Sequence, residues 1–384
     1  MPSRSLRWTA GLAVIAALIG CAAVPGAAAA KTRWVDDDGK AGPSTCAGSH
    51  AVPKKVQTQV TASAAGDVVR VCPGTYVGAI LIKGARDRLT VTATPKQGVI
   101  LFPTGTTMSA LVTIDRVDKV TLSGLAVRIP VDGTCAASLT GIYVSGAKAA
   151  TIKRADIRPD GVNTKGACGI NTGIYLTAST GMVLGGAVKD AKGNAVLIDA
   201  TGNVTVDGLQ VEYAHAGVAA TSASGAMISV SGDARATIRN VTIAGIASAG
   251  VTTPQLTTGI NLSDAGMNVT IVDASISHAM AGVKVDSVAT GLIISGVHVT
   301  DSGTALALQS GSGLDVSGTT VSAVEMGIDV SGPGVIASTI HDNDLTGATT
   351  GCRDETSGTG TAGTANIWTH DTGTATAPAG ICTP

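Results

Sequence analysis

The sequence predicts an all-β solenoid: a single-stranded right-handed parallel β-helix of about nine or more coils, with a short N-terminal capping helix. Over residues 267–330, apolar and small polar residues alternate in short segments, as in strands with one buried face. Aliphatic residues there recur at a step of five and then of seven, and the unit repeats about every 22 residues, which is typical of a coiled solenoid. The three units are Ile271/Ile276/Val283, Ile294/Val299/Leu306 and Val316/Val321/Ile328.

The five-residue step extends backwards along the chain. It joins Leu122/Val127, Ile152/Ile157, Val183/Val188, Val206/Val211 and Ile238/Ile243, and Ile340 is expected to close the series of second members. Several early coils are longer. Insertions after Val127, Ile157 and Ile243 fall at one edge of the solenoid, whereas the extra residues of the Val211 coil are expected after Val218, at a different corner. Long loops on a regular scaffold commonly carry function.

Composition excludes some partners. Of 384 residues, 14% are charged and 2% aromatic, 50 are glycine, and the formal net charge is -1. Because there is no global basic field and no interleaving of aromatic with basic residues, a nucleic-acid partner is not predicted. The chain is long enough for two ordinary domains, but a solenoid needs only one continuous core. A monomer is expected.

Residues 1–30 read as a signal peptide. Arg4 and Arg7 precede an apolar run over residues 8–20, which is too short for a transmembrane span. Two processing sites remain open. Cleavage can follow Ala30, or the segment ending in Cys21 can act as a lipobox that leaves a lipidated cysteine. Both predict export, to the cell exterior or as a cell-surface lipoprotein.

Six cysteines follow the leader, and none forms a C-x-x-C motif, so disulfides are favoured over a zinc site. Cys135 and Cys168 lie in insertions of neighbouring coils. Stacked strands are ~4.8 Å apart and disulfide Cα atoms ~5.5 Å apart, so this pair is predicted. The other predicted pairs are Cys46–Cys72, joining the N-terminal cap to the first coil, and Cys352–Cys382, closing a C-terminal loop.

Three regions are expected after the leader. Residues 31–88 form an N-terminal cap and first coil, in which Val52, Val56 and Val60 place an apolar stripe on a short helix. Residues 89–345 form the β-helix, and residues 346–384 form a C-terminal cap.

Two motifs near the N-terminus carry a family resemblance. Residues 34–39 read WVDDDG, and residues 65–76 read AGDVVRVCPGTY. Together with the coils, they resemble secreted bacterial β-helix proteins of the pectate-lyase-like superfamily. The resemblance implies the fold and not one activity, since the superfamily holds lyases, hydrolases, epimerases and proteins of other roles.

One outward-facing column is rich in charge. The residue after each second-strand aliphatic is expected to stack on its equivalent in the next coil. Stacked like charges repel, so an anionic chain along the axis would compensate this column. Alternatively, nearby acids neutralise it as ordinary surface ion pairs. The column reads Arg128, Arg158, Lys189, Glu212, Ala244, Ser277, Thr300, Ser322 and His341, with Asp132, Asp156, Asp160, Asp190, Tyr213 and His215 beside it.

The resemblance implies a specific chemistry for this column. Polysaccharide lyases of this fold use Arg or Lys as a base together with carboxylate-bound Ca²⁺, which points to Arg158 or Lys189 as base. The possible Ca²⁺ ligands are then Asp156, Asp160, Asp190 and Glu212. Hydrolysis needs paired carboxylates instead, for which Glu212 and Asp190 are the candidates. The RIPVDG motif at residues 128–133 is similar to the R-x-P-x-x-R motif of pectate lyases, but Gly133 replaces its final arginine.

Substrate contacts are predicted from Arg128, Tyr143, Tyr175, Tyr213 and His215. The two outward tyrosines of equivalent GIY segments can form a sugar platform or simply an aromatic pair between strands. Two functions therefore stay open: a carbohydrate-active protein, lyase or hydrolase, that binds a polysaccharide, and a non-catalytic surface or adhesion module. A catalytic groove predicts that the column is open to solvent, and a scaffold predicts that it is paired off.

Overall fold

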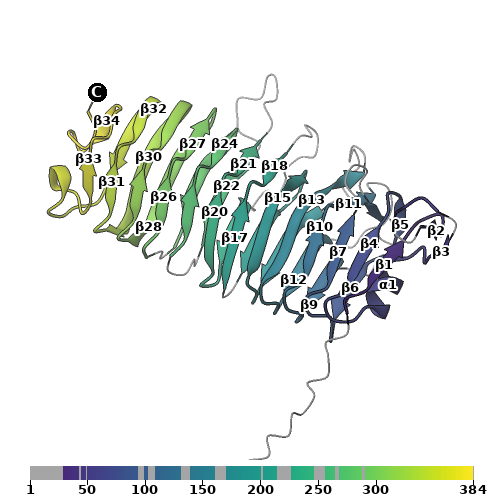
Figure 1. The fold of residues 1–384 in the computed structure, drawn as a ribbon. Helices are drawn as coiled ribbons and strands as arrows, with labels where there is room; N and C mark the ends of the chain where they lie inside the picture. Colours follow the sequence, from purple (N-terminus) through teal and green to yellow (C-terminus); the bar gives the residue numbers. More distant parts are fainter. Residues whose placement is uncertain are drawn as a thin grey trace, which may run out of the picture.

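The protein forms a right-handed parallel β-helix in which each coil contributes one strand to each of three stacked faces (Figure 1). The computed structural model describes residues 29–42, 45–48, 50–93, 99–102, 109–130, 139–160, 170–199, 202–213, 226–245, 256–263, 268–287 and 290–383.

The first face consists of parallel strands whose inward residues are the first members of the five-residue pairs. Its strands are β1 (Thr32–Val35), β4 (Val68–Val71), β7 (Thr90–Ala93), β10 (Thr121–Ser123), the first halves of β13 (Ala150–Asp160) and β15 (Gly181–Lys189), β17 (Asn203–Asp207), β20 (Arg235–Arg239), β23 (Thr270–Val272), β26 (Ile293–Ser295), β29 (Asp315–Ser317), β31 (Thr339–His341) and β33 (Ile367–Thr369).

The second face carries the second members of those pairs. Its strands are β5 (Thr75–Val77), β8 (Val99–Phe102), β11 (Leu125–Pro130), the second halves of β13 and β15, β18 (Gln210–Glu212), β21 (Thr242–Ala244), β24 (Ser275–Ser277), β27 (His298–Thr300) and the first parts of β30 (Thr320–Ile336) and β32 (Asp344–Asp354).

The third face closes each coil. Its strands are β6 (Ile80–Lys83), β9 (Ala110–Asp115), β12 (Leu139–Ser145), β14 (Ile170–Thr177), β16 (Asn194–Asp199), β19 (Ala226–Ser231), β22 (Leu256–Leu262), β25 (Ala279–Val285), β28 (Thr304–Ser312), the later parts of β30 and β32, and β34 (Ala375–Ala377).

The strand register confirms the predicted spacing. Ile238 on the first face pairs with Ile271 of the next coil, and Ile243 on the second face pairs with Ile276. All four side chains are buried. These columns bury one aliphatic residue per strand per coil, and burial of such a side chain stabilises a fold by about 1.5–3 kcal/mol. The solenoid core is therefore the direct product of the sequence period.

Close packing between the second and third faces requires glycine at position 173. A Cβ added at Gly173 would lie 2.5 Å from Cγ1 of Val188 and 2.6 Å from the carbonyl oxygen of Ala195. Neither distance is sterically possible, so glycine at this position lets the second-face aliphatic fill the core.

The predicted end of the second-face series is wrong. Ile340 pairs with Val316 and Trp368, which places it on the first face, and the buried Leu345 five residues later follows it. The reason is that Ile340 and Leu345 form a further five-residue pair, so Ile340 is its first member and continues the column of Val316. His341 therefore stacks on Ser317 and Thr369 and lies outside the charged column.

The fourth insertion also lies elsewhere than predicted. Ile228 pairs with Val196 and Ile260 on the third face, so the third-face residue of this coil comes 17 residues after Val211. Val218 itself lies outside the described residues. All four insertions therefore connect a second-face strand to a third-face strand: β11 to β12, β13 to β14, β18 to β19, and β21 to β22.

The N-terminal end is covered by α1 (Val56–Ala62), which packs against β1, β4 and β6 and buries Val56 and Val60. Val52 precedes the helix and joins a separate small cluster with Trp34 and the Cys46–Cys72 disulfide, so the predicted stripe is shorter than expected. An antiparallel pair, β2 (Lys40–Ala41) and β3 (His50–Ala51), lies beside it. No helix in the described ranges is long and apolar enough to span a membrane.

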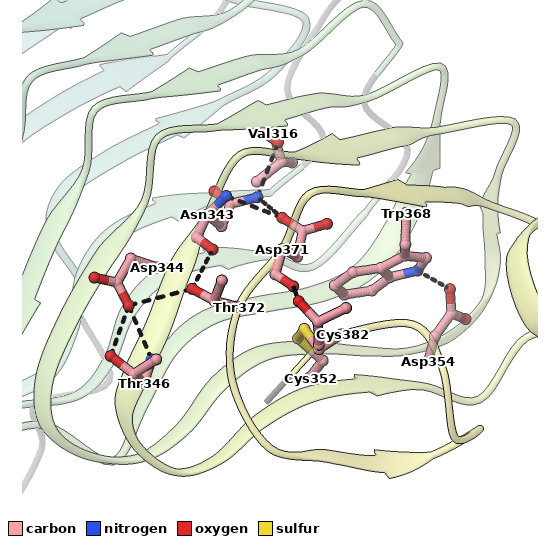
Figure 2. The surroundings of a disulfide bond; sticks show 11 residues. Val316, Asn343, Asp344, Thr346, Cys352, Asp354, Trp368, Asp371, Thr372 and Cys382 are labelled. Carbon is pink, nitrogen blue, oxygen red and sulfur yellow. Dashed lines mark hydrogen bonds between the residues drawn. A yellow bond between two sulfur atoms is a disulfide. The ribbon is translucent and has the colours of Figure 1, made fainter.

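At the other end the parallel ladder continues to β34, past the short 3-10 helix η1 (Thr361–Gly363). The predicted Cys352–Cys382 disulfide closes this end, with 6.2 Å between the Cα atoms (Figure 2). The Cys46–Cys72 bond is likewise confirmed, with 5.5 Å between its Cα atoms. Cys135 and Cys168 lie outside the described residues.

Candidate functional site

The predicted charged column exists on the outer surface of the second face. Arg128 on β11 pairs in register with Arg158 on β13, and Lys189 on β15 pairs with Glu212 on β18. Lys189 directly follows Val188, which pairs with Ile157. These four residues are called the charged row below. Alternation along each strand places them outward, and each lies at or near the end of a strand, three of them just before an insertion.

Arg128 has a structural position in this row. Its side chain is 9% exposed, and its guanidinium forms an ion pair with the Asp156 carboxylate. Its Nη1 also donates to the carbonyl oxygens of Asp156 at 2.7 Å and Val127 at 3.1 Å. A buried guanidinium with this many partners holds two coils together, and it has little surface left for a ligand.

Arg158 is the accessible member. Its side chain is 47% exposed, and its Nη2 lies 3.6 Å from Oδ2 of Asp156, beyond hydrogen-bond range. Because Asp156 already pairs with Arg128, the second arginine keeps most of its donors directed at solvent. A planar fork of N–H donors in this position can bind carboxylates or sugar hydroxyls.

Lys189 and Glu212 form an ion pair across neighbouring coils, with side chains 34% and 44% exposed. This is the contact that an ammonium makes with a carboxylate, whereas a general base needs an unprotonated amine. The pair therefore fits hydrogen bonding to a ligand better than proton abstraction.

The residues beside the row are less available. Tyr213 is buried, and its backbone N–H donates to the Ala244 carbonyl at 2.9 Å. Burial, with a smaller contribution from the Asp190 charge, raises the pKa of Tyr213. The side chain of Asp160, and all of Asp132 and His215, lie outside the described residues. Tyr213 thus contributes to packing, and the structure does not bring it into contact range of a surface ligand.

The two predicted tyrosines meet on the third face. Tyr143 on β12 and Tyr175 on β14 pair in register, with ring centroids 5.2 Å apart and planes tilted by 49°. The Tyr175 hydroxyl donates to Oδ2 of Asp199 at 3.1 Å. Burial and then Asp199 raise the pKa of Tyr175. Both rings are half-buried, so one edge of the pair faces solvent.

Asp199 was not predicted as part of this cluster. It follows the buried Ile198 in β16 and pairs with Thr177 in the preceding coil. Only the third-face register places it one coil beyond Tyr175, and this register follows from the column of Ile142, Ile174 and Val196. The sequence did contain a signal for this contact, because Asp199 is an outward-facing carboxylate next to the outward-facing column of Tyr143 and Tyr175.

Two of the predicted Ca²⁺ ligands have other partners in the structure, and the side chain of a third, Asp160, lies outside the described residues. Asp156 is occupied by arginines, Glu212 by a lysine, and no group of three or more His, Cys, Asp or Glu side chains suited to a metal occurs in the described part of the chain.

The three acids of the N-terminal WVDDDG motif bind backbone, as turn-capping acids do. Asp37 Oδ2 accepts from the N–H of Thr75 at 3.1 Å, and Asp38 Oδ1 from that of Lys40 at 2.7 Å. Burial raises the pKa of Asp36, whose Oδ1 accepts from the N–H of Asp38. They serve the cap and lie outside the charged row.

Solved structures share this fold at low sequence identity. ORF18 of Geobacillus virus E2 superposes with a TM-score of 0.55 and 14% identity, over 74% of this chain and 55% of that one. The PL6 family polysaccharide lyase Pedsa3628 from Pseudopedobacter saltans gives 0.52 and 13%, over 82% and 90%. The AlgE6 A-module, a mannuronan C-5 epimerase from Azotobacter vinelandii, gives 0.48 and 15%, over 84% and 94%.

This chain thus spans about half of the ORF18 chain. The likenesses to ORF18 and Pedsa3628 show the fold alone, the parallel β-helix that the N-terminal motifs predicted. No curated protein matches the sequence significantly. The two disulfides indicate a location outside the cytoplasm. Residues 131–377 match the family described as periplasmic copper-binding protein (NosD). Because this match covers well over half of the sequence, the chain belongs to the NosD family.

Proposed function

We propose that this protein is an exported β-helix protein that binds a polysaccharide at the charged row, without cleaving it. The observation that carries the proposal is the arrangement of Arg158, Lys189 and Glu212, one per coil, half-exposed and in line with the solenoid axis. Such a line offers hydrogen-bond donors and acceptors at regular intervals, which suits successive sugars of an extended chain.

Binding is favoured over catalysis because the charges are paired. Arg128 and Asp156 hold each other, and so do Lys189 and Glu212. A lyase would need a free base and a cation, and a hydrolase would need two free carboxylates. Neither set occurs among the described residues of the row.

The Tyr143–Tyr175 pair supports the same proposal. It lies in the coils of Arg128 and Arg158, across the edge that carries the insertions. An aromatic edge of this kind can stack on a sugar ring while the Asp199 carboxylate accepts from its hydroxyls. The fold is also that of a polysaccharide lyase, Pedsa3628, which agrees with a glycan ligand.

Copper, which the family description names, does not fit the described side chains. Copper sites use imidazole, thiolate and thioether ligands, and Cu(II) also takes tetragonal sets of N and O ligands. The four described cysteines are in disulfides, and the ranges that the structure covers hold no group of three or more His, Cys, Asp or Glu side chains that could hold a metal ion. No copper chemistry is therefore assigned to these residues.

The test combines binding with product formation. The mature protein is titrated with a panel of neutral and acidic polysaccharides, with and without Ca²⁺, while unsaturated sugars and reducing ends are followed. We expect binding to at least one polymer without product. Arg158→Ala and Glu212→Gln should weaken it by about tenfold, the equivalent of 1.4 kcal/mol.

Arg239→Ala is the matched control. Arg239 forms a comparable half-exposed ion pair with Asp207 at 2.9 Å, but on the first face. It should bind like the wild type. Product formation that disappears in Arg158→Ala or Lys189→Ala would instead establish an enzyme. Absence of binding to every polymer would favour the non-catalytic module without a glycan ligand, for which the pairing of charges is sufficient.

A further inference from the structure

A second cationic surface lies at the corner between the third and first faces, near the N-terminal end of the solenoid. The turns of successive coils stack there through backbone hydrogen bonds. The N–H of Gly66 donates to the carbonyl of Asp87 at 2.8 Å, that of Arg88 to Asp118 at 2.9 Å, and that of Lys119 to Lys148 at 2.7 Å. The side chains of Arg88, Lys119 and Lys148, called the basic corner below, therefore come from consecutive coils.

The two carboxylates at this corner maintain the turns. Asp87 Oδ1 accepts a hydrogen bond of 2.9 Å from the backbone N–H of Asp118, and Asp118 Oδ1 accepts one of 2.9 Å from that of Lys148. Each acid thus links its own turn to the next. Their bonding is accounted for by the backbone, and neither forms an ion pair with Arg88, Lys119 or Lys148.

The three cations are exposed and carry no side-chain hydrogen bond or ion pair to any residue that the structure describes. Arg88 and Lys119 occupy equivalent positions in consecutive coils, which are ~4.8 Å apart, and like charges at that spacing repel. Lys148 lies in the next coil, one position earlier, in the column of Asp87 and Asp118. The contrast with the charged row is direct, because there Arg128 and Lys189 each have a carboxylate partner. Folding alone gives no reason for three unpaired cations in succession.

The surface is hollowed at this corner. A depression of about 580 Å³ is lined by Gly66, Asp87, Arg88, Asp118 and Lys119, together with two alanines. The lining combines the cationic side chains of Arg88 and Lys119 with the carboxylates of Asp87 and Asp118, and the rest of it is glycine and alanine. Each carboxylate already accepts a hydrogen bond from a backbone N–H, whereas the two cations have no side-chain partner among the described residues and can meet an anionic group.

We propose that the basic corner binds an acidic polysaccharide through its carboxylate or sulfate groups. One cation per coil along the axis matches an extended polymer with a charge on successive units, and each contact would relieve the repulsion between cations. A single-stranded nucleic acid is disfavoured because such sites stack bases on aromatic side chains, and the lining has none. This site is independent of the charged row, which lies on the second face.

The same ladder provides an internal control. After Lys119 the equivalent positions hold Ala149, Thr180 and Asn203, and then Arg235. Arg235 is exposed and lacks a side-chain partner in the described ranges, as Arg88 does, but no cation precedes or follows it in the ladder. It therefore has the charge of the basic corner without the cluster.

The experiment uses the mature chain and measures affinity for polygalacturonate, dextran and a single-stranded DNA oligonucleotide at low salt, about 50 mM. The triple variant Arg88→Gln/Lys119→Gln/Lys148→Gln keeps polar, unbranched side chains and removes the three charges. We expect the wild type to bind polygalacturonate and not dextran at this corner, and raised salt to weaken binding. The triple variant should bind polygalacturonate about tenfold or more weakly, and Arg235→Gln within about twofold of the wild type.

Several outcomes would overturn the proposal. They are wild-type levels of polygalacturonate binding by the triple variant, equal loss in Arg235→Gln, or DNA binding as tight as that of the glycan. If the triple variant does not fold, the three single variants are measured, and each should weaken binding about two- to threefold. Arg158→Ala separates the two sites, because it should weaken binding at the charged row and leave the charge-dependent component at the basic corner intact.

Discussion

The indole nitrogen of Trp368 donates a hydrogen bond of 2.8 Å to Oδ2 of Asp354, and both side chains are buried in the last coils (Figure 2). The same carboxylate accepts from Asn366 Nδ2 at 3.1 Å and from the N–H and hydroxyl of Thr356 at 3.0 and 2.6 Å. A buried charge is thus surrounded by four donors. It fixes the strand of Trp368 to the chain that precedes it.

Removal of this carboxylate should destabilise the C-terminal coils. Asp354→Ala leaves the donors of Trp368, Asn366 and Thr356 without an acceptor, which should cost about 3 kcal/mol or more. Urea unfolding followed by tryptophan fluorescence measures the change. Asp344 gives the matched control, since its Oδ1 accepts from the N–H and hydroxyl of Thr346 in the same local pattern at the exposed surface. Asp344→Ala should cost less than about 1 kcal/mol, and equal losses would contradict the assigned role.

Asp371 predicts a pH dependence of stability. Its Oδ1 accepts two hydrogen bonds from Asn343, at 2.7 and 3.0 Å, while its Oδ2 is buried without a hydrogen-bond partner in the described ranges (Figure 2). Burial raises the pKa of Asp371 above its ordinary value. The folded state therefore holds this proton more tightly than the unfolded state. The resulting stabilisation is present below the unfolded pKa and is lost as the pH rises through the folded pKa.

Asp371→Asn should remove this dependence. The difference in unfolding free energy, variant minus wild type, should increase as the pH rises from about 4 towards neutrality. Asp342→Asn is the control of opposite sign, because hydrogen bonding to His341 lowers the pKa of Asp342. The stabilisation that Asp342 gives to the wild-type fold is present above the unfolded pKa of this carboxyl, and it is lost as the pH falls through its folded pKa. A difference for Asp371→Asn that is constant with pH would show that Asp371 does not titrate differently on folding.

Alanine substitutions of Arg128 and Arg158 should distinguish a residue that stabilises the fold from one that is available to a ligand. Arg128→Ala leaves the Asp156 carboxylate and two carbonyls without their buried partner and should destabilise the fold by about 3 kcal/mol. Arg158→Ala removes a long, half-exposed contact and should change stability by less than about 1 kcal/mol. Thermal unfolding of both variants tests this order. A larger loss of stability in Arg158→Ala than in Arg128→Ala would show that Arg158, and not Arg128, supports the fold.

The Cys352–Cys382 bond should stabilise the C-terminal end. It spans 30 residues, for which loop-closure entropy predicts about 3–4 kcal/mol. Cys352→Ser/Cys382→Ser should unfold at lower urea concentration than the wild type, and a reducing agent should no longer change its transition at this end. Cys46→Ser/Cys72→Ser, across 26 residues, gives the corresponding test for the N-terminal cap. Unchanged midpoints in both double variants would show that the bonds are not stabilising.

Much of the scaffold follows from sequence alone, because each coil repeats its core residues at fixed steps. Val206/Val211 and Ile238/Ile243 predict both their faces and their partners. Ile340 was misassigned because one aliphatic residue does not by itself show whether it is the first or the second member of a pair, and the five-residue step that continues to Leu345 makes Ile340 a first member.

The site was harder to predict than the fold. The outward column containing Arg158 and Lys189 could be located by counting from the core. The acids that neutralise this column could not be identified from the sequence. Asp156 lies between two arginines, and only the three-dimensional register decides which of them it pairs with. The basic corner was missed for a related reason. Arg88, Lys119 and Lys148 lie in turns, where the core period gives no direction.

The shared position of the four insertions makes the solenoid a scaffold for peptide display. Each insertion joins a second-face strand to a third-face strand, and the aliphatic columns on either side fix the register independently of the length between them. Lengthening a loop has a small entropic cost, ~0.6 kcal/mol per doubling. Foreign segments spliced between β11 and β12, or between β21 and β22, should therefore be presented side by side along one edge, at multiples of the coil rise, while the remaining coils fold as before.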